Sequence, residues 1–210
     1  MKTTLKWVAL FVVVEQIALG WSPSADRFTW VMENVPVWIG GMAIMLTWKK
    51  FPLSNLCLVL LAIHSLILAV GGHYTYAKVP LGDWVRDAFH LARNHYDRLG
   101  HLAQGFIPAI LIREILVRKL GLRGGAAALL AIACSLAFSA FYELVEWWTA
   151  LATGEGATAF LGTQGDVWDT QWDMCLALIG SSAAMLLLPK WHDSSMAKLR
   201  LEKRREQSGP

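Results

Sequence analysis

Charged side chains are scarce in this 210-residue chain. Lys, Arg, Asp and Glu make up 17% of it, against about 25% in an ordinary soluble domain. With 55% hydrophobic residues and a mean hydropathy of +0.42, the composition argues against a soluble domain and indicates a membrane protein. The formal net charge is only +3, so we expect no nucleic-acid partner.

Cysteine and the familiar catalytic motifs are also missing or rare. The three cysteines lie inside apolar runs without a C-x-x-C spacing, which argues against a disulfide framework and against a paired-cysteine zinc site. H-E-x-x-H, the Walker loop, the G-x-S-x-G elbow and the Rossmann glycine motif are absent from the sequence. Any chemistry must therefore come from carboxylates, histidines and amides.

Long apolar stretches and tryptophan are abundant instead. The chain has 11 Trp, a residue that favours the membrane interface. A crossing needs about 20 mostly apolar residues, and six stretches qualify: near 5–21, 31–48, 53–71, 98–117, 125–148 and 170–188. The first run resembles a signal peptide, but Glu15 and Gln16 interrupt it, so we expect a retained helix. We predict an all-α, six-helix membrane bundle as a single domain, 1–189, followed by a basic cytoplasmic tail, 190–210.

The Lys and Arg residues favour one orientation of this bundle. If both termini are cytoplasmic, the outer segments hold only Arg27, Lys78, Arg86, Arg93 and Arg98. Most other basic residues flank the cytoplasmic ends of the crossings or lie in the tail. Because basic loops stay in the cytoplasm, we predict an N-in, C-in topology in the bacterial inner membrane, with membrane lipids as neighbours.

An outer segment near 82–96 has amphipathic helical character. Its polar residues continue into the fourth crossing at intervals of three, four and seven residues, which marks one helical face. Two arrangements fit this pattern. Either one long helix emerges from the membrane, or a separate surface helix meets the fourth crossing near residue 95.

Acidic and histidine side chains gather at the outer ends of the fourth, fifth and sixth crossings. On each helix they recur at spacings of three or four residues, so they share a face and can reach one ion together. Buried charges cost about 2.5–3.5 kcal/mol each on insertion scales, and a bound cation would offset that cost. The metal ligands that we predict are Asp97, His101, Glu143, Asp169 and Asp173. This set suits Zn, Mn or Fe(II), and an all-carboxylate subset would suit Mg or Ca.

Further residues complete the predicted site. We assign Glu146 as a general base. The accessory candidates are Glu33, His73, His90, Asn94, Gln104 and Asp166. Some of these have plainer interpretations: Asp166 also fits an N-cap of the sixth helix, and His73 fits an ordinary interfacial histidine. His192, in the cytoplasmic tail, is assigned no role.

Three separated motifs carry a family resemblance. They are Asn-His-Tyr-Asp-Arg-Leu-Gly-His at 94–101, Tyr-Glu-Leu-Val-Glu-Trp at 142–147, and Gln-Gly-Asp-Val-Trp-Asp at 164–169 with Asp173 closing the run. With these motifs the chain resembles the YjdF-like family of uncharacterised bacterial inner-membrane proteins over nearly its whole length. The resemblance implies a multi-spanning inner-membrane protein and supplies no reaction. The order of an early Asp/His helix, a later acidic helix and a final Asp-rich helix is also similar to VanZ-like membrane proteins.

Three functions fit these observations. The first is a metal-dependent enzyme that hydrolyses a lipid-linked or envelope substrate at the outer leaflet. The second is a transporter or ion-binding protein. Against transport, the inner halves of the helices carry few polar groups, and Arg113 and Glu114 are the exceptions. The third is a structural or partner-binding membrane protein whose acids are neutralised by Arg86, Arg93 and Arg98. The sequence does not define an oligomeric state.

Overall fold

Every element of the described structure is helical. The computed structural model describes residues 3–153 and 164–208, with side chains up to residue 202. The helices are α1 (Thr3–Gly20), α2 (Arg27–Thr47), α3 (Asn55–Tyr74), the 3-10 turn η1 (Tyr76–Lys78), α4 (Pro80–Phe89), α5 (Tyr96–Lys119), α6 (Gly124–Thr153), α8 (Asp169–Leu187) and α9 (Pro189–Ser208). The all-α prediction is confirmed for these residues. All six predicted apolar segments form helices within a few residues of the expected bounds.

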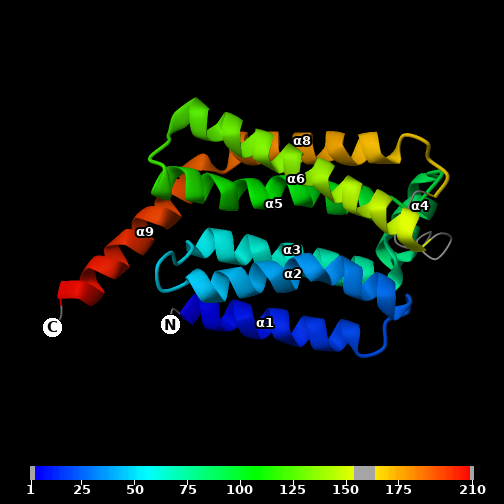
Figure 1. Cartoon of the computed structure of the whole chain (residues 1–210), viewed down its shortest axis with the longest axis horizontal. Helices are drawn as coiled ribbons and strands as arrows, with labels where there is room; N and C mark the ends of the chain where they lie inside the picture. Colours follow the sequence, from blue (N-terminus) through cyan, green and yellow to red (C-terminus); the bar gives the residue numbers. More distant parts are fainter. Residues whose placement is uncertain (1–2, 154–163, 209–210) are drawn as a thin grey trace.

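The long helices form two layers (Figure 1). One layer holds α1, α2 and α3, the other holds α5, α6 and α8, and α3 packs against α5 to join them. The short helix α4 lies at one end of the bundle and α9 leaves it at the other. We call these the α4 end and the α9 end.

Two glycines let α5 and α8 touch through their backbones. A Cβ atom added at Gly105 would collide with the backbone of Ala177, and one added at Gly180 would collide with the backbone of Leu102. Only glycine permits so close an approach. The contact fixes the register of the two helices, and it is this register that brings polar residues of α5 and α8 together at the α4 end.

Apolar side chains fill the interior and also cover much of the surface. Leu58, Ile110 and Ala184 lie in a buried cluster shared by α3, α5 and α8, whereas Leu46 is 78% exposed and Leu186 82% exposed. So much exposed apolar surface is expected for helices that face lipid. The fold therefore has the surface of a membrane bundle.

Four helices, α1, α3, α5 and α6, are individually long and apolar enough to cross a bilayer. A fifth span results if α8 and the following part of α9, which are bent by 66° relative to each other, count as one. Among the described helices, α2 does not qualify, and it carries Arg27, Glu33 and Asn34. A multi-helix membrane bundle is thus established, while the sixth crossing and the orientation stay predictions.

The segment near 82–96 holds a short helix, α4, that is separate from α5. Helix α4 ends at Phe89, its C-cap His90 adopts a left-handed conformation with φ 53°, and α5 begins at Tyr96. Of the two sequence-based alternatives, the separate helix that meets the fourth crossing near residue 95 is confirmed. The continuous helix is not formed. The tail is also helical, as α9.

Candidate functional site

Six ionisable side chains converge at the α4 end, from four helices. We call them the α4-end cluster: Glu33 from α2, Asp97 and His101 from α5, Glu143 and Glu146 from α6, and Asp173 from α8. His101 is 6% exposed and Asp173 is 3% exposed. The predicted meeting of α5, α6 and α8 at this end therefore occurs in the structure, with α2 as an additional contributor.

His101 stands at the centre of the cluster. Its Nε2 lies 3.6 Å from Asp97 Oδ1 and 3.8 Å from Asp173 Oδ2, and its Nδ1 lies 3.9 Å from Glu143 Oε1. These separations are too long for hydrogen bonds. They are close to the roughly 3.4 Å between neighbouring ligand atoms that each bind one ion at about 2.1 Å in a tetrahedral arrangement. The spacing suits ligands around a shared cation.

Several buried polar atoms of this region have no hydrogen-bond partner among the described residues. They are His101 Nδ1, Glu143 Oε1 and Asp173 Oδ1, together with Nε2 of the neighbouring Gln104. Buried polar groups are nearly always hydrogen-bonded, and an unpaired buried charge is costly. These three unsatisfied atoms lie on neighbouring side chains of types that could hold a metal ion.

Two triads of side chains meet the distance requirement for a metal site. Asp97, His101 and Asp173 form one, and His101, Glu143 and Glu146 form the other. Because His101 belongs to both, and its two ring nitrogens face different carboxylates, one ion cannot use both sides of the ring. The triads define either alternative positions for one ion or two adjacent positions.

A small cavity of about 20 Å³ adjoins the first triad, which is room for about one water molecule. Glu33, Tyr76, Asp97, His101, Tyr142 and Glu146 line it. Tyr142 donates a hydrogen bond of 3.4 Å to Glu33 Oε2. The predicted base Glu146 and the accessory residues Glu33 and Gln104 therefore lie at the same cavity as His101.

Sequence reasoning missed the two tyrosines of this cavity. The Tyr76 ring occupies space left by Gly71 and Gly100, where an added Cβ would collide with it. These two glycines are the only sign in the sequence that a large side chain packs here. They point to Tyr76 only once the positions of α3, η1 and α5 are known. Tyr142 lies within one of the three family motifs, but the search for carboxylates and histidines did not single it out.

A rim of ion pairs separates this cluster from the surface at the α4 end. Arg93 Nη1 lies 2.6 Å from Asp169 Oδ1, and Arg98 Nη2 lies 2.8 Å from Asp166 Oδ2. Asp169, a predicted metal ligand, therefore pairs with an arginine and belongs to neither triad. The role of Asp169 as a metal ligand stays a prediction, and its ion pair with Arg93 argues against that role.

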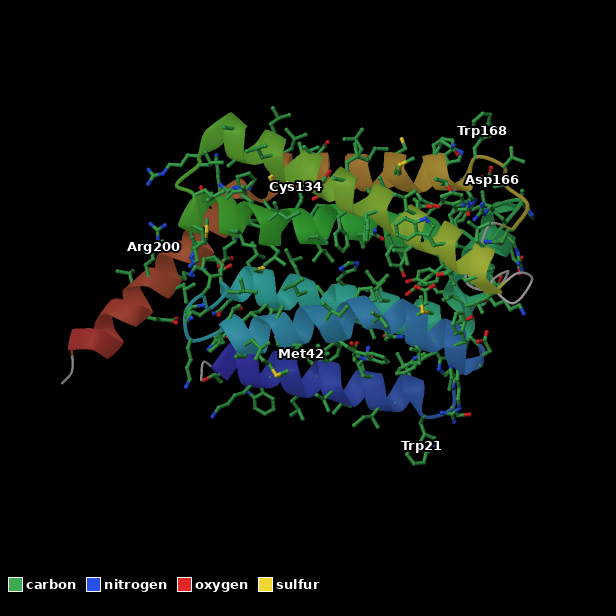
Figure 2. All side chains as sticks on the ribbon, viewed as in Figure 1. Trp21, Met42, Cys134, Asp166, Trp168 and Arg200 are labelled. Carbon is green, nitrogen blue, oxygen red and sulfur yellow. The ribbon has the colours of Figure 1, made fainter. Side chains whose placement is uncertain are left out.

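Asp166 has a structural role at the start of α8 (Figure 2). Its Oδ1 accepts a hydrogen bond of 3.0 Å from the Trp168 backbone N–H, although α8 itself begins at Asp169. This bond, with the nearby charges of Arg93 and Arg98, holds the pKa of Asp166 below its usual range. The interpretation of Asp166 as the N-cap of this helix is wrong, because the N-cap is Trp168 and Asp166 instead holds the turn two residues before it.

Three accessory candidates lie outside the cluster. His73 Nδ1 is 2.7 Å from the Leu19 carbonyl, which ties the end of α3 to the end of α1. His90 is exposed at the end of α4. Asn94 is fully buried, and its amide donates to the Val79 carbonyl and to Asp83. The structure therefore does not bring these three residues into the α4-end cluster, and for His90 and Asn94 the reason is that the stripe from 82 to 104 is broken where α4 ends.

A second buried polar cluster lies at the α9 end, and sequence reasoning did not identify it. We call Ser54, Arg113, Glu114, Arg118 and His192 the α9-end cluster. Glu114 and His192 are both 0% exposed. Glu114 accepts from the Ser54 backbone at 2.8 Å, from His192 Nε2 at 3.0 Å, and from Arg118 in an ion pair. His192, which was assigned no role, therefore fastens α9 to α5.

A family model of predicted membrane proteins, DUF2238, matches residues 4–194. The chain is also 49% identical, over 168 residues and 80% of each chain, to a curated relative, the inner membrane protein YjdF of Escherichia coli (strain K12). No solved structure matches. Both matches confirm the YjdF-like resemblance, and with the apolar helices they place the chain in the bacterial inner membrane as a multi-pass protein.

Proposed function

The chain belongs to the DUF2238 family of predicted membrane proteins, and from this premise we propose that its α4-end cluster binds a divalent cation. The observation that supports it is the set of unpartnered, buried atoms on His101, Glu143 and Asp173. A cation in the second triad would satisfy His101 Nδ1 and Glu143 Oε1, a cation in the first triad would bind Asp173, and either would allow neighbouring carboxylates to stay ionised together. The set of nitrogen and oxygen atoms suits Zn, Mn or Fe(II), with Mg or Ca as the choice of a purely carboxylate subset.

We further propose six crossings with both termini in the cytoplasm. In this topology α2 is a crossing in spite of its polar residues, because Glu33 and Asn34 are buried against other helices rather than facing lipid. The basic residues between α5 and α6 and in α9 then lie inside, as the distribution of Lys and Arg favours. The α4-end cluster lies near the periplasmic face.

The reaction that we propose is hydrolysis of a lipid-linked or envelope substrate. A divalent cation lowers the pKa of a bound water and so generates a nucleophile. Glu146 lines the cavity next to His101, where it can accept the proton of that water. Glu33 and Tyr142, hydrogen-bonded to each other, would orient the water or the substrate from the opposite wall.

Transport has less support. Ile107, Ala109 and Ile110 lie on α5 between the two polar clusters, and all three are buried and apolar. An ion path needs polar groups along its length. A purely structural role suits the rim, where Arg93 and Arg98 pair with acids, but it does not account for the unpartnered atoms of the cluster.

Elemental analysis of the purified protein after loading with single divalent cations tests this proposal. We expect about one or two ions per wild-type chain, and their loss in the double variant His101→Ala, Glu143→Ala. The matched control is Asp87→Ala, His90→Ala, an exposed acid–histidine pair at the same end. Glu146→Gln should retain an ion in the first triad, of which it is not a member, but lose turnover of envelope lipids. A folded wild type that binds none of these cations would overturn the proposal.

A further inference from the structure

The cavity of the α4-end cluster lies between the two layers of the bundle (Figure 1). Glu33 on α2 and Leu68 on α3 line it from one layer, and Gln104 on α5 and Tyr142 on α6 line it from the other. The polar end of a substrate must reach this place, because the proposed base Glu146 also lines the cavity. The packing around the cavity therefore determines from which side a substrate comes.

Three sides of the cavity are closed by packed side chains or backbone. Toward the α4 end lies the rim, where Arg93 and Arg98 are paired with acids. Toward the α9 end lies the apolar core, in which Ile110 of α5 is fully buried. Toward α8, Gly105 and Gly180 bring the backbones of α5 and α8 into contact, which leaves no passage between these two helices.

The fourth side, between α2 and α6, lacks such packing. Helix α2 packs on α3, α3 on α5 and α5 on α6, whereas α2 and α6 are not among the closely packed pairs of described helices. They lie in different layers (Figure 1), and the hydrogen bond of 3.4 Å from the Tyr142 hydroxyl to Glu33 Oε2 joins them. We call the line between α2 and α6 at Glu33 and Tyr142 the α2–α6 seam.

The exposure of the lining residues differs between the walls of the cavity. Asp97, His101 and Gln104 on α5 are buried, and none of them is more than 8% exposed. Tyr142 and Glu146 on α6 are partly exposed. Because α6 borders the α2–α6 seam, the cavity reaches the molecular surface on this side of the bundle.

The surface next to the seam is apolar and has room for a chain. On α6, Phe138 lies one turn from Tyr142 and is 51% exposed. On α2, Gly40 lies two turns from Glu33 on the same face, and nothing lies within 4 Å of the place that a Cβ atom there would take. Since exposed apolar surface on a membrane bundle faces lipid, the seam opens to the acyl chains of the bilayer.

We infer that the α2–α6 seam is the substrate entrance, and that the substrate is a lipid whose chain stays in the membrane while its polar end enters the cavity. The inference deepens the proposed function, on which it rests for the reaction itself. The Tyr142–Glu33 hydrogen bond closes the entrance and must break before the polar end reaches Glu146. The apolar chain then lies beside Phe138 and fills the open space at Gly40.

Two carbodiimides of different solubility test this route without any divalent cation. Dicyclohexylcarbodiimide partitions into membranes, whereas its cationic, water-soluble analogue with an ethyl and a dimethylaminopropyl group does not, and both modify carboxyl groups. The full chain is reconstituted in liposomes with chelator and with reagent on both sides. We expect the apolar reagent to modify Glu146, as located by peptide mass spectrometry, and the water-soluble reagent to leave it unmodified. Asp87, whose side chain is 69% exposed, should react with the water-soluble reagent and shows that it is active.

Three substitutions locate the entrance. Gly40→Trp fills the open space beside α2 and should slow the modification of Glu146 by the apolar reagent several-fold. Gly125→Trp is the matched control, because Gly125 on α6 has equally open surroundings but lies near the α9 end, and it should leave the rate unchanged. Tyr142→Phe removes the closing hydrogen bond and should raise the rate. Melting temperatures of the variants show that each is folded.

Three results would overturn the inference. Modification of Glu146 by both reagents at equal rates would show that the cavity opens to water. A Glu146 that neither reagent modifies, in the wild type or in Tyr142→Phe, would show that no entrance exists there. A Gly40→Trp variant that reacts as fast as the wild type would place the entrance elsewhere. The cation site is tested separately by elemental analysis, so a protein that binds no cation but admits the apolar reagent would keep the entrance and lose the proposed hydrolysis.

Discussion

The two buried polar clusters lie on the same helix, α5, and differ in how completely their polar atoms are paired. At the α9 end, both carboxylate oxygens of Glu114 accept hydrogen bonds, from Ser54, Arg118 and His192. At the α4 end, His101 and its neighbouring carboxylates approach each other only to 3.6–3.9 Å, and three of their atoms lack partners among the described residues.

The cations explain this difference. The α9-end cluster includes Arg113 and Arg118, so a buried carboxylate there is neutralised by the chain itself. At the α4 end the arginines lie on the rim, and the nearest, Arg93, is 3.8 Å from Asp97 while it bonds directly to Asp169. The interior of the α4-end cluster thus holds an excess of carboxylates over side-chain cations.

The α9-end cluster, which joins two helices, is therefore a complete hydrogen-bonded network, whereas the α4-end cluster is incomplete. A fully satisfied network rigidifies a structure, whereas a partly satisfied one is costly. Departures from complete pairing are expected mainly at functional sites. The contrast is the strongest structural reason to assign function to the α4 end and a structural role to the α9 end.

The largest expected effect comes from breaking the complete network. Glu114→Ala should lower the free energy of unfolding by about 3–5 kcal/mol, because it leaves buried cationic and polar partners unpaired. Thermal or denaturant unfolding in detergent micelles measures this loss. Asp193→Ala, which removes the 58% exposed partner of Arg113, should cost only about 0–1 kcal/mol. Equal losses in the two variants would show that burial of the α9-end network contributes little.

The second-largest effect is expected from cation binding, which should depend on the α4-end cluster and not on the α9-end cluster. At a free cation concentration of 100 times Kd, the wild type should gain about 2.7 kcal/mol of stability, measured as a rise in melting temperature. Asp173→Asn removes a ligand from the first triad and should abolish most of that gain. Glu114→Gln should keep the gain, although its melting temperature starts lower. A gain that Asp173→Asn leaves intact would mean that the cation binds elsewhere.

When divalent cations are absent, neutralising a carboxylate of the α4-end cluster should increase the free energy of unfolding instead of lowering it. In the presence of a chelator, Glu143→Gln should raise the free energy of unfolding by about 1 kcal/mol, as substitutions that relieve a functional site often do. The cause is loss of repulsion with the neighbouring acid Glu146. With saturating cation the same variant should be less stable than the wild type. A loss of stability in both conditions would place Glu143 in an unrecognised network like that of Glu114.

Much of the fold could be predicted from the sequence because apolar run length and helical periodicity are local properties. The six predicted segments match α1, α2, α3, α5, α6 and α8 within a few residues. The bend between α8 and α9 and the break after His90 depend on how the helices pack. A polar face continuing from α4 into α5 therefore favoured neither the long helix nor the two separate ones.

The site was predictable only as far as spacing goes. Residues three or four apart share a helix face, which identified Asp97 with His101 and Glu143 with Glu146 correctly as neighbours. Spacing does not say which faces meet. Gly105 and Gly180 set the contact of α5 with α8. Both lie inside predicted crossings, but the sequence does not say which other helix packs against them.

Long-range pairs account for the remaining differences. Asp169 shares its stripe with Asp173, yet Arg93, far away in sequence, takes it out of the triads. Glu114 and His192 are joined across 78 positions, and each alone resembles an isolated polar residue in an apolar helix or a surface tail. Such pairs have no local pattern, so only coordinates could show them.

The smallest effect is expected at the partly exposed Arg98–Asp166 pair of the rim. Asp166→Asn should lower the melting temperature only slightly at pH 7, and added salt should shrink the difference further because exposed ion pairs are screened.

The pH dependence of this stabilisation has a definite sign. The pKa of Asp166 is held below its usual range by the Trp168 N–H and by Arg93 and Arg98. The stabilisation is therefore complete above the ordinary Asp pKa of about 3.9. It is lost as the pH falls through the lower, folded-state pKa. Melting curves of the wild type and Asp166→Asn should differ constantly from about pH 5 to 8 and converge in stronger acid. A difference that widens on acidification would show that the rim belongs electrostatically to the unpaired interior and not to the neutralised surface.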